Sequence, residues 1–275
     1  MTSRFTRLIP HAVVAAAAAV VVLILLVPGA IANGKDVPAP PAQPTSADQI
    51  QNLDQVKTAI KAYYGDTMTS TLDPVNGTVQ LHTFSPSGAY ANEMAGIEAD
   101  AEKYLDKAAK HDKKFSGKPA VLFDIDDTTL NTFSYEIYSN FVFNPTTNAA
   151  FVNNAVFPAV PGMPALASHA RADGYTVFFL TGRPEAQRPG TVTNLANAGY
   201  GTEDTSHLFL KDLTAPWLTS CAPSCTTTQY KSLTRQHIES LGYDIAANFG
   251  DQFSDLNGGF ADRTFKIPNP MYFLP

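Results

Sequence analysis

The chain has 275 residues and a formal net charge of −6, with 44% hydrophobic and 16% charged residues. This length is ample for one hydrophobic core. A nucleic-acid partner is not expected, because binding to nucleic acid requires a basic surface and this chain is acidic.

The N-terminus has the pattern of an export signal. Two arginines precede an uncharged apolar run over residues 12–27, and Pro28 and Gly29 break that run. The Ala-Ile-Ala sequence at 30–32 offers a small-x-small cleavage site, so we predict a signal peptide over residues 1–32. The predicted location is secreted or extracytoplasmic, without stable membrane association after cleavage. An uncleaved membrane anchor is the alternative, although the run is short for a membrane span.

Residues 33–48 are rich in proline and alanine and predict a flexible tether, followed by one domain over 49–275. Apolar residues at helical spacing predict helices over Gln49–Tyr64, Tyr90–His111, Met163–Ala172, Thr191–Ala198 and Tyr230–Leu241. The segment between Gly65 and Gly88, which contains several glycines and prolines, is predicted to be a loop.

Short apolar runs predict strands over Ala120–Asp124, Tyr175–Thr181, His207–Leu210, Tyr243–Phe249 and Thr264–Ile267. These strands alternate with the predicted helices in the second half of the chain. Apolar strands that alternate with helices indicate an α/β fold, with a parallel sheet covered by helices on both faces.

Four polar motifs fall at or near the ends of the predicted strands. They are FDIDDTTLNT at 123–132, FFLTGR at 178–183, YKSLTRQHI at 230–238 and NFGDQFSDL at 248–256. The carboxyl ends of parallel strands meet at one edge of a sheet, so these motifs are expected to face a common crevice.

Together, the four motifs resemble those of the haloacid dehalogenase (HAD) superfamily, in particular its acid phosphatase branch, subfamily IIIB, with class B-like and plant-type acid phosphatases. The resemblance runs from about Tyr90 to the C-terminus. It implies a Rossmann-like fold with N-terminal helices and a small helical cap or flap at about 131–161. It also implies a phosphoric monoester hydrolase, a Mg²⁺-dependent acid phosphatase that acts on small phosphate monoesters through an aspartyl-phosphate intermediate. With the predicted export signal, this enzyme is expected to be secreted.

The resemblance also implies roles for four residues of the motifs. Asp124 would be the nucleophile that forms the aspartyl-phosphate. Asp126 would protonate the leaving group and then activate water. Thr181 and Lys231 would hold the phosphoryl oxygens that are not transferred.

A carboxylate that attacks a phosphate dianion needs a cation to mask its charge, and Mg²⁺ prefers oxygen ligands. By resemblance, the ligands are the side chains of Asp124 and Asp251 and the backbone carbonyl of Asp126. Asp255 would act from outside the ligand set, through water or by holding Lys231.

Several residues near these motifs have no single predicted role. Asp127 is expected to lie in a solvated turn or to cap a helix. Arg183 either steers anionic substrate or pairs with a nearby acid. An aromatic cluster in the expected cap region forms a packing face or lines a substrate pocket, and consists of Phe133, Tyr135, Tyr138, Phe141 and Phe143.

The two cysteines, Cys221 and Cys225, are predicted to form a disulfide in an exported protein, with a reduced pair as the alternative. A structural zinc site is disfavoured because the chain has no further cysteine.

Two other functions stay open. One is a phosphotransferase that passes the same phosphoryl group to an alcohol, and the other is a storage or binding protein without turnover. The sequence does not identify the physiological substrate, the pH optimum or the oligomeric state.

Overall fold

A computed structural model describes residues 45–50, 52–110, 115–201 and 205–274. The predicted signal peptide over 1–32 lies outside the described residues, as do residues 33–44 of the predicted tether. The remaining tether residues lead into a short 3₁₀ turn, Ala47–Gln49. Across the described ranges, no helix combines the length and the apolar character needed to cross a membrane. The boundaries of the tether, the domain and the cap stay predictions.

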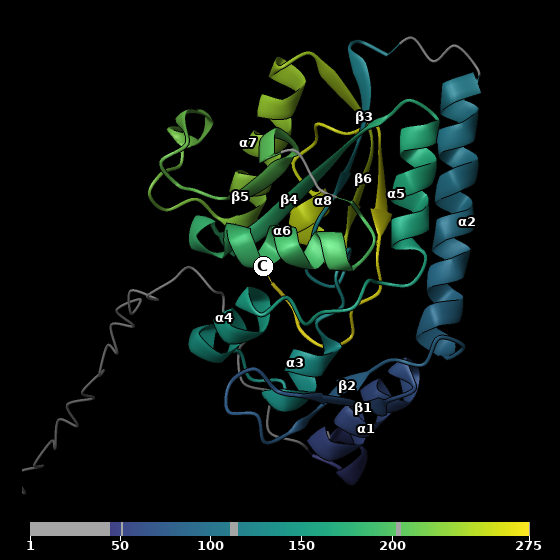
Figure 1. The fold of residues 1–275 in the computed structure, drawn as a ribbon, viewed down its shortest axis with the longest axis vertical. Helices are drawn as coiled ribbons and strands as arrows, with labels where there is room; N and C mark the ends of the chain where they lie inside the picture. The colour runs from purple at the N-terminus through teal and green to yellow at the C-terminus, as the bar shows by residue number, and fades with distance from the viewer. Residues whose placement is uncertain (1–44, 51, 111–114, 202–204, 275) are drawn as a thin grey trace, which may run out of the picture. The chain divides into compact units, whose positions relative to one another are not determined.

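A five-stranded parallel sheet forms the centre of the described fold (Figure 1), in the order β5-β4-β3-β6-β7. Its strands are β3 (Lys118–Phe123), β4 (Thr176–Pro184), β5 (Leu208–Lys211), β6 (Tyr243–Gly250) and β7 (Arg263–Lys266). The predicted parallel sheet is therefore confirmed, and each predicted strand lies close to its expected residues.

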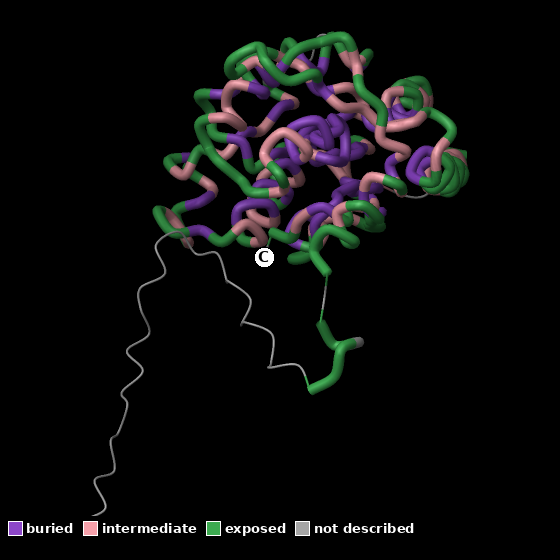
Figure 2. The backbone as a smooth tube through the Cα atoms, turned by 90° about the horizontal axis from the view of Figure 1, so that it is seen from below, coloured by how far each residue is buried: buried purple, intermediate pink, exposed green. Residues whose placement is uncertain are grey.

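Helices cover both faces of this sheet. Val121 and Phe123 of β3 belong to one buried cluster, while Leu122 between them belongs to the other. The first cluster includes side chains of α2 (Ala89–Lys110), α5 (Met163–Ala172) and α6 (Arg188–Asn197), and the second includes those of α7 (Thr227–Ser240). Figure 2 shows the buried backbone gathered inside the described part, with exposed segments around it. Because alternate residues of a strand point to opposite faces, the continuous apolar run of β3 contributes side chains to both hydrophobic cores.

The first described helix and a hairpin make up the N-terminal part of the described fold. α1 (Leu53–Tyr64) begins where the Asn52 side chain accepts hydrogen bonds from two backbone N–H groups. The predicted loop between Gly65 and Gly88 is wrong, because β1 (Thr67–Leu72) and β2 (Gln80–Thr83) pair there as an antiparallel sheet. β1 is largely exposed, so it lacks the apolar alternation that reveals a half-buried strand.

Two short helices lie within the predicted cap segment, α3 (Phe133–Tyr138) and α4 (Pro145–Asn153). α4 approaches α6 closely at Gly190, where an added Cβ atom would lie 2.5 Å from the carbonyl oxygen of Val152. A glycine at this position therefore lets the two backbones come together.

Candidate active site

The floor of one cavity in the described part of the chain lies at the carboxyl end of β3. The backbone N–H of Asp124 donates a hydrogen bond of 2.9 Å to the carbonyl oxygen of Phe249 in β6, which fixes Asp124 against the neighbouring strand. Asp124 is 7% exposed and lines a cavity of about 700 Å³.

The walls of this cavity come from separate parts of the chain: the ends of the central strands, the two cap helices, the start of α7 and the C-terminal segment. Its lining includes Asp126, Glu136, Phe143, Ala149, Gly182, Arg183, Lys211, Lys231, Asp251, Asp255, Tyr272, Phe273 and Leu274. The strand-end motifs thus meet in one cavity, as the topology of the sheet requires.

Lys231 is buried beside the nucleophile candidate. Its Nζ atom contacts Oδ1 of Asp124 and lies 2.6 Å from the carbonyl oxygen of Leu180 and 3.1 Å from Oδ1 of Asp255. Burial alone would lower the pKa of the Lys231 ammonium, but Asp124 and Asp255 outweigh it and raise the pKa. The lysine is therefore a fixed positive charge at the cavity floor.

α7 presents Lys231 to the cavity. The helix begins at Thr227, three residues before its predicted start, and Thr226 and Gln229 form a reciprocal capping box. Lys231 consequently lies inside the helix rather than at its N-terminus.

Three buried acids come together beside Lys231. Asp124, Asp251 and Asp255 each offer a carboxylate oxygen, and these atoms lie within 4.8 Å of one another. Burial and the Asp255 carboxylate raise the pKa of Asp124 and of Asp251. A divalent cation would remove this repulsion, and carboxylate oxygens are the donors that hard cations prefer. The residues therefore fit a metal site, while the donor set leaves the identity of the metal open.

The orientation of Asp251 is set by two amide side chains. Its Oδ2 atom accepts hydrogen bonds from Gln252 Nε2 at 2.6 Å and from Asn269 Nδ2 at 2.7 Å. Oδ1 is left with a weak contact to the Thr128 hydroxyl at 3.4 Å. Sequence reasoning missed Asn269, which lies 18 residues from Asp251 in a proline-containing segment with no apolar periodicity.

Asp126 forms a forked ion pair with Arg183. Arg183 Nη2 lies 2.6 Å from Oδ1 of Asp126, and Nε lies 3.0 Å from Oδ2. The third nitrogen, Nη1, donates to the Thr191 hydroxyl at 3.0 Å. Of the two alternatives for Arg183, the structure favours the pairing with an acid over a free cation that steers substrate.

Thr181 is fully buried in β4, next to the cavity lining. Its hydroxyl oxygen accepts a hydrogen bond of 3.1 Å from the backbone N–H of Arg183. The cavity is lined by its neighbour Gly182 and not by Thr181 itself. The contact of Thr181 with phosphate therefore stays a prediction.

Asp127 is not the solvated residue that the sequence suggested. It is fully buried with a left-handed φ of 55°, and it accepts hydrogen bonds from the backbone and hydroxyl of Thr132 and from the Tyr272 hydroxyl. Burial raises the pKa of Asp127 to about 7, against the lowering effect of these hydrogen bonds. Through these hydrogen bonds, Asp127 links the turn after β3 to the C-terminal segment.

Some residues of the predicted aromatic cluster belong to a packing face, and another lines the cavity. Phe133 and Tyr135 are fully buried, and Phe133 stacks on Tyr64 with ring centroids 4.5 Å apart. Phe143 is 56% exposed and lines the cavity. Packing therefore explains the first two residues, and Phe143 belongs to the pocket.

Cys221 and Cys225 lie just before α7, with their sulfur atoms 2.00 Å apart as in a disulfide. Cys225 directly precedes Thr226, the residue that caps α7. The cysteine pair is therefore joined to the start of the helix that carries Lys231.

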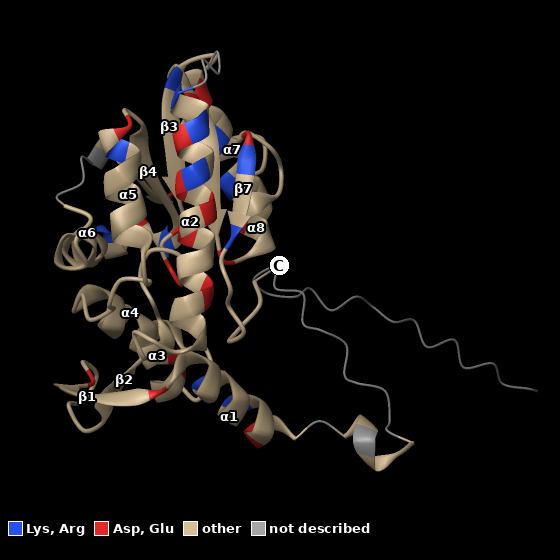
Figure 3. Ribbon diagram, turned by 90° about the vertical axis from the view of Figure 1, so that its right-hand side faces the viewer, with Lys and Arg blue, Asp and Glu red and all other residues tan. Residues whose placement is uncertain are grey.

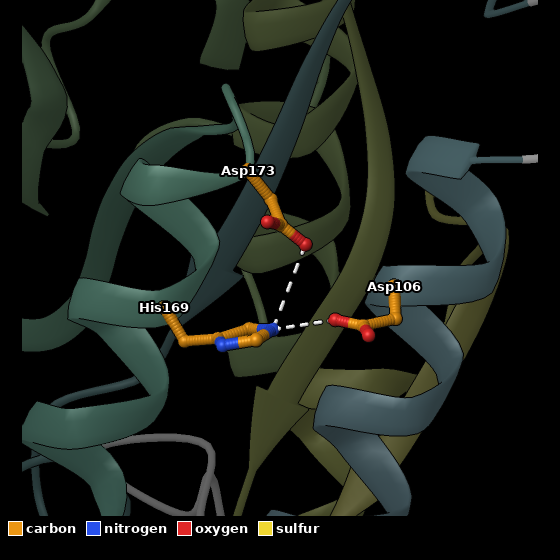
Figure 4. A group of neighbouring side chains, drawn as sticks. All are labelled: Asp106, His169 and Asp173. Atoms are coloured by element: carbon orange, nitrogen blue, oxygen red, sulfur yellow. Dashed lines mark hydrogen bonds and ion pairs between the residues drawn. The ribbon is translucent and has the colours of Figure 1, made fainter.

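A second group of possible metal ligands lies between α2 and α5 and consists of Asp106, His169 and Asp173 (Figure 4). His169 Nε2 lies 2.7 Å from Asp106 and 3.5 Å from Asp173, and Lys110 also binds Asp106 at 2.6 Å. Figure 3 shows that charges of both signs follow one another along α2. The group is half-buried, lies outside the cavity lining and ties one helix to the other.

Comparison with known proteins places this geometry in a family. Residues 74–275 match the family described as HAD superfamily, subfamily IIIB (Acid phosphatase). Acid phosphatase 1 of Solanum lycopersicum is 34% identical over 187 residues, which are 65% of this chain and 70% of that protein. The Stem 28 kDa glycoprotein of Glycine max is 35% identical over 57% of this chain and 61% of its own length.

Two further likenesses are more distant. Vegetative storage protein 1 of Arabidopsis thaliana is 28% identical over 56% of this chain and 55% of its own length. A solved structure of the class C acid phosphatase from Bacillus anthracis has a TM-score of 0.53 and 23% identity, covers 66% of this chain and 80% of that one, and supports the fold alone. On the match over residues 74–275, the chain belongs to the acid phosphatase family of HAD subfamily IIIB, which confirms the predicted family and the predicted class of phosphoric monoester hydrolase.

Proposed function

We propose that this protein is a secreted, Mg²⁺-dependent acid phosphatase that hydrolyses small phosphate monoesters through an aspartyl-phosphate on Asp124. The observation that carries the proposal is the floor of the cavity, where Asp124 contacts the buried ammonium of Lys231 and lies beside Asp251 and Asp255. This arrangement suits a carboxylate that must approach a phosphate dianion.

In the first step, a carboxylate oxygen of Asp124 attacks phosphorus, and the bond between phosphorus and the leaving oxygen breaks. Asp126, two residues further on at the same cavity, gives its proton to that oxygen. In the second step, Asp126 takes a proton from water, which attacks the aspartyl-phosphate and releases inorganic phosphate. Arg183 holds the Asp126 carboxylate through its forked pair, which prepares it to take the proton from water in the second step.

The charge of the transferred phosphoryl group is shared by several residues. Lys231 supplies a fixed ammonium, which Asp255 holds in place at 3.1 Å, and Thr181 supplies a hydroxyl donor. The side chains of Asp124 and Asp251 and the backbone carbonyl of Asp126 would hold Mg²⁺. When bound, the metal offsets the negative charge of the carboxylates and of the phosphate.

The test is a phosphate-release assay over a panel of phosphomonoesters, with the protein in Mg²⁺, in EDTA, and in EDTA followed by Mg²⁺ or Ca²⁺. Release should stop in EDTA, return with Mg²⁺, and return poorly with Ca²⁺, which takes more ligands at longer distances. Turnover that EDTA leaves unchanged would contradict the proposed metal dependence. The absence of phosphate release from every monoester would contradict the proposed phosphatase activity. Added glycerol measures phosphotransfer, which would appear as glycerol phosphate in place of free phosphate.

A storage or binding role is the second candidate, because a vegetative storage protein is among the relatives. The full set of residues proposed for turnover is nevertheless present: Asp124, Asp126, Thr181, Lys231, Asp251 and Asp255. A binding protein would take up a phosphate ester at one equivalent without releasing product, and a storage protein would release none. Calorimetry alongside the release assay therefore separates these roles from turnover.

Export is proposed from the N-terminal pattern. N-terminal sequencing of the protein recovered outside the cytoplasm should begin at Asn33. A chain that retains residues 1–32 and sediments with membranes would support the uncleaved anchor instead.

A further inference from the structure

Glu136 is a buried acid of the cavity that the proposed reaction does not use. It lies on α3, is 6% exposed and lines the cavity together with Asp126. Within the described part of the chain, no side chain forms a hydrogen bond or an ion pair with its carboxylate. Burial of an unpaired carboxylate costs free energy, which a partner of opposite charge offsets.

Among the residues that the structure describes, none supplies that partner. Lys211, one of the three cations of the cavity lining, forms no ion pair with Glu136. Arg183, a cation of the same cavity, directs its nitrogens to Asp126 and Thr191. Lys231 is engaged by Asp124 and Asp255 at the cavity floor. Glu136 and Asp126 line the same cavity. Burial raises the pKa of Glu136 to about 7, and repulsion from Asp126 adds to the effect.

The proposed role of Asp126, which lines the same cavity, indicates which part of the substrate would contact Glu136. In the proposed mechanism, Asp126 faces the oxygen of the leaving group, so the space beyond Asp126 belongs to the leaving group and not to the phosphate. Apolar side chains in the same lining, Phe143, Ala149 and Phe273, suit a hydrocarbon or aromatic body. A leaving group that is apolar and carries one positive charge would match both features.

We propose that Glu136 is a specificity-determining residue that binds an ammonium group on the leaving alcohol, so that the preferred substrates are phosphate esters of amine-bearing alcohols or phenols. This inference rests on the proposed function for the identity of the leaving-group side of the cavity. A carboxylate on the leaving group would be repelled at the same position.

The test compares two phosphate esters of similar shape, tyramine phosphate, which carries an ammonium, and 4-propylphenyl phosphate, in which a methyl group replaces it. At pH 8, where the Glu136 carboxylate is ionised, the wild-type kcat/KM should favour tyramine phosphate by about tenfold, the scale of one charge-assisted hydrogen bond.

Glu136→Gln keeps the shape of the side chain and removes its charge. The kcat/KM for tyramine phosphate should fall, whereas that for 4-propylphenyl phosphate should rise because a carboxylate no longer repels the phosphate dianion. The ratio should approach one. Glu185→Gln is the matched control, because Glu185 pairs with Arg188 outside the cavity lining, and it should keep the wild-type ratio.

A wild-type ratio near or below one overturns the inference, and so does a Glu136→Gln variant in which both substrates lose activity equally, as expected for a structural role. Calorimetry with the benzylic phosphonate analogues of both esters separates this inference from the proposed function. If no ester is hydrolysed but the aminated phosphonate still binds about tenfold more tightly in a Glu136-dependent way, the proposed function fails and the assignment of Glu136 stands.

Discussion

Two clusters of possible metal ligands in this molecule have similar spacing and different surroundings. Asp124, Asp251 and Asp255 are buried at the carboxyl ends of strands, whereas Asp106, His169 and Asp173 lie half-buried between two helices. In both clusters the donor atoms lie within 4.8 Å of one another. Proximity of ligand atoms alone therefore does not distinguish a site from a surface salt bridge.

Charge balance and orientation make the difference. In the helical cluster, Lys110 and His169 both contact Asp106. At the strand ends, two of the three carboxylates contact Lys231, and amide side chains hold the third, Asp251, by a single oxygen. The buried cluster has three carboxylates and one ammonium at the floor of a cavity, whereas the half-buried cluster has two carboxylates, one ammonium and a histidine outside the cavity lining.

The largest contrast is expected between Asp124→Asn and Asp106→Asn, which make the same chemical change in the two clusters. Asp124→Asn should lower phosphate release by at least about 10³-fold, because an amide cannot form the acyl-phosphate. Asp106→Asn should retain activity. Circular dichroism checks that both variants are folded, and a folded, active Asp124→Asn protein would end the proposed mechanism.

The orientation of Asp251 is tested by Asn269→Ala, which removes a hydrogen bond to its Oδ2 atom. The Mg²⁺ concentration for half-maximal activity should rise by about 10- to 100-fold, the usual effect of losing a partner of a metal ligand. Asn92→Ala, at an exposed position of α2, is the control. An unchanged Mg²⁺ requirement in Asn269→Ala would mean that Asn269 does not position Asp251 for the metal.

Burial of an unpaired acid should also appear in the pH dependence of stability. The pKa of Glu136 rises from 4.5 to about 7 on folding, so the folded state holds its proton more tightly. Both states are protonated below pH 4.5; between pH 4.5 and 7 only the unfolded state ionises, and the free energy of unfolding falls as pH rises. Over this range, the free energy of unfolding of the wild type should fall by about 3 kcal/mol because of Glu136, and Glu136→Gln should not show this fall. Denaturant titrations in EDTA measure both. Parallel pH profiles for wild type and variant would contradict the raised pKa.

The cysteine pair tests how firmly Lys231 must be held. The double variant Cys221→Ser, Cys225→Ser opens a very small loop, so its melting temperature should change little. Its kcat/KM should fall several-fold, because the pair adjoins the cap of α7 and small displacements of a phosphate ligand are costly. Free-thiol titration of the exported, denatured protein comes first, since two reactive thiols would show that no bridge forms. Full activity in the double variant would show that the bridge does not position Lys231.

The smallest effect is expected for His169→Ala in the helical cluster. Partly exposed ion pairs contribute little to stability, so the melting temperature should fall by no more than a few °C. Phosphate release and its Mg²⁺ dependence should stay at the wild-type level. A metal-dependent rise of the wild-type melting temperature that His169→Ala abolishes would instead show that this cluster binds a metal.

The sequence predicted the strand-end acids and the parallel sheet because both leave a local pattern, an apolar run followed by a polar motif. Asp127 shows where local pattern fails, since the hydroxyl that covers it comes from Tyr272, 145 residues away. The same holds for Asn269, which binds Asp251 from 18 residues away, and for Glu136, which lines the cavity with residues from distant segments. The β1–β2 hairpin was missed for the opposite reason, because an exposed strand has little hydrophobic pattern.

The C-terminal segment has a practical consequence for handling the protein. Tyr272, Phe273 and Leu274 line the cavity, and the backbone N–H of Leu274 donates to Gln252 Oε1 at 2.9 Å. A purification tag or a fluorescent fusion joined directly after these residues would therefore begin beside the cavity lining and crowd incoming substrate. Attachment between the predicted cleavage site and α1 keeps such additions at the opposite end of the sequence from these lining residues.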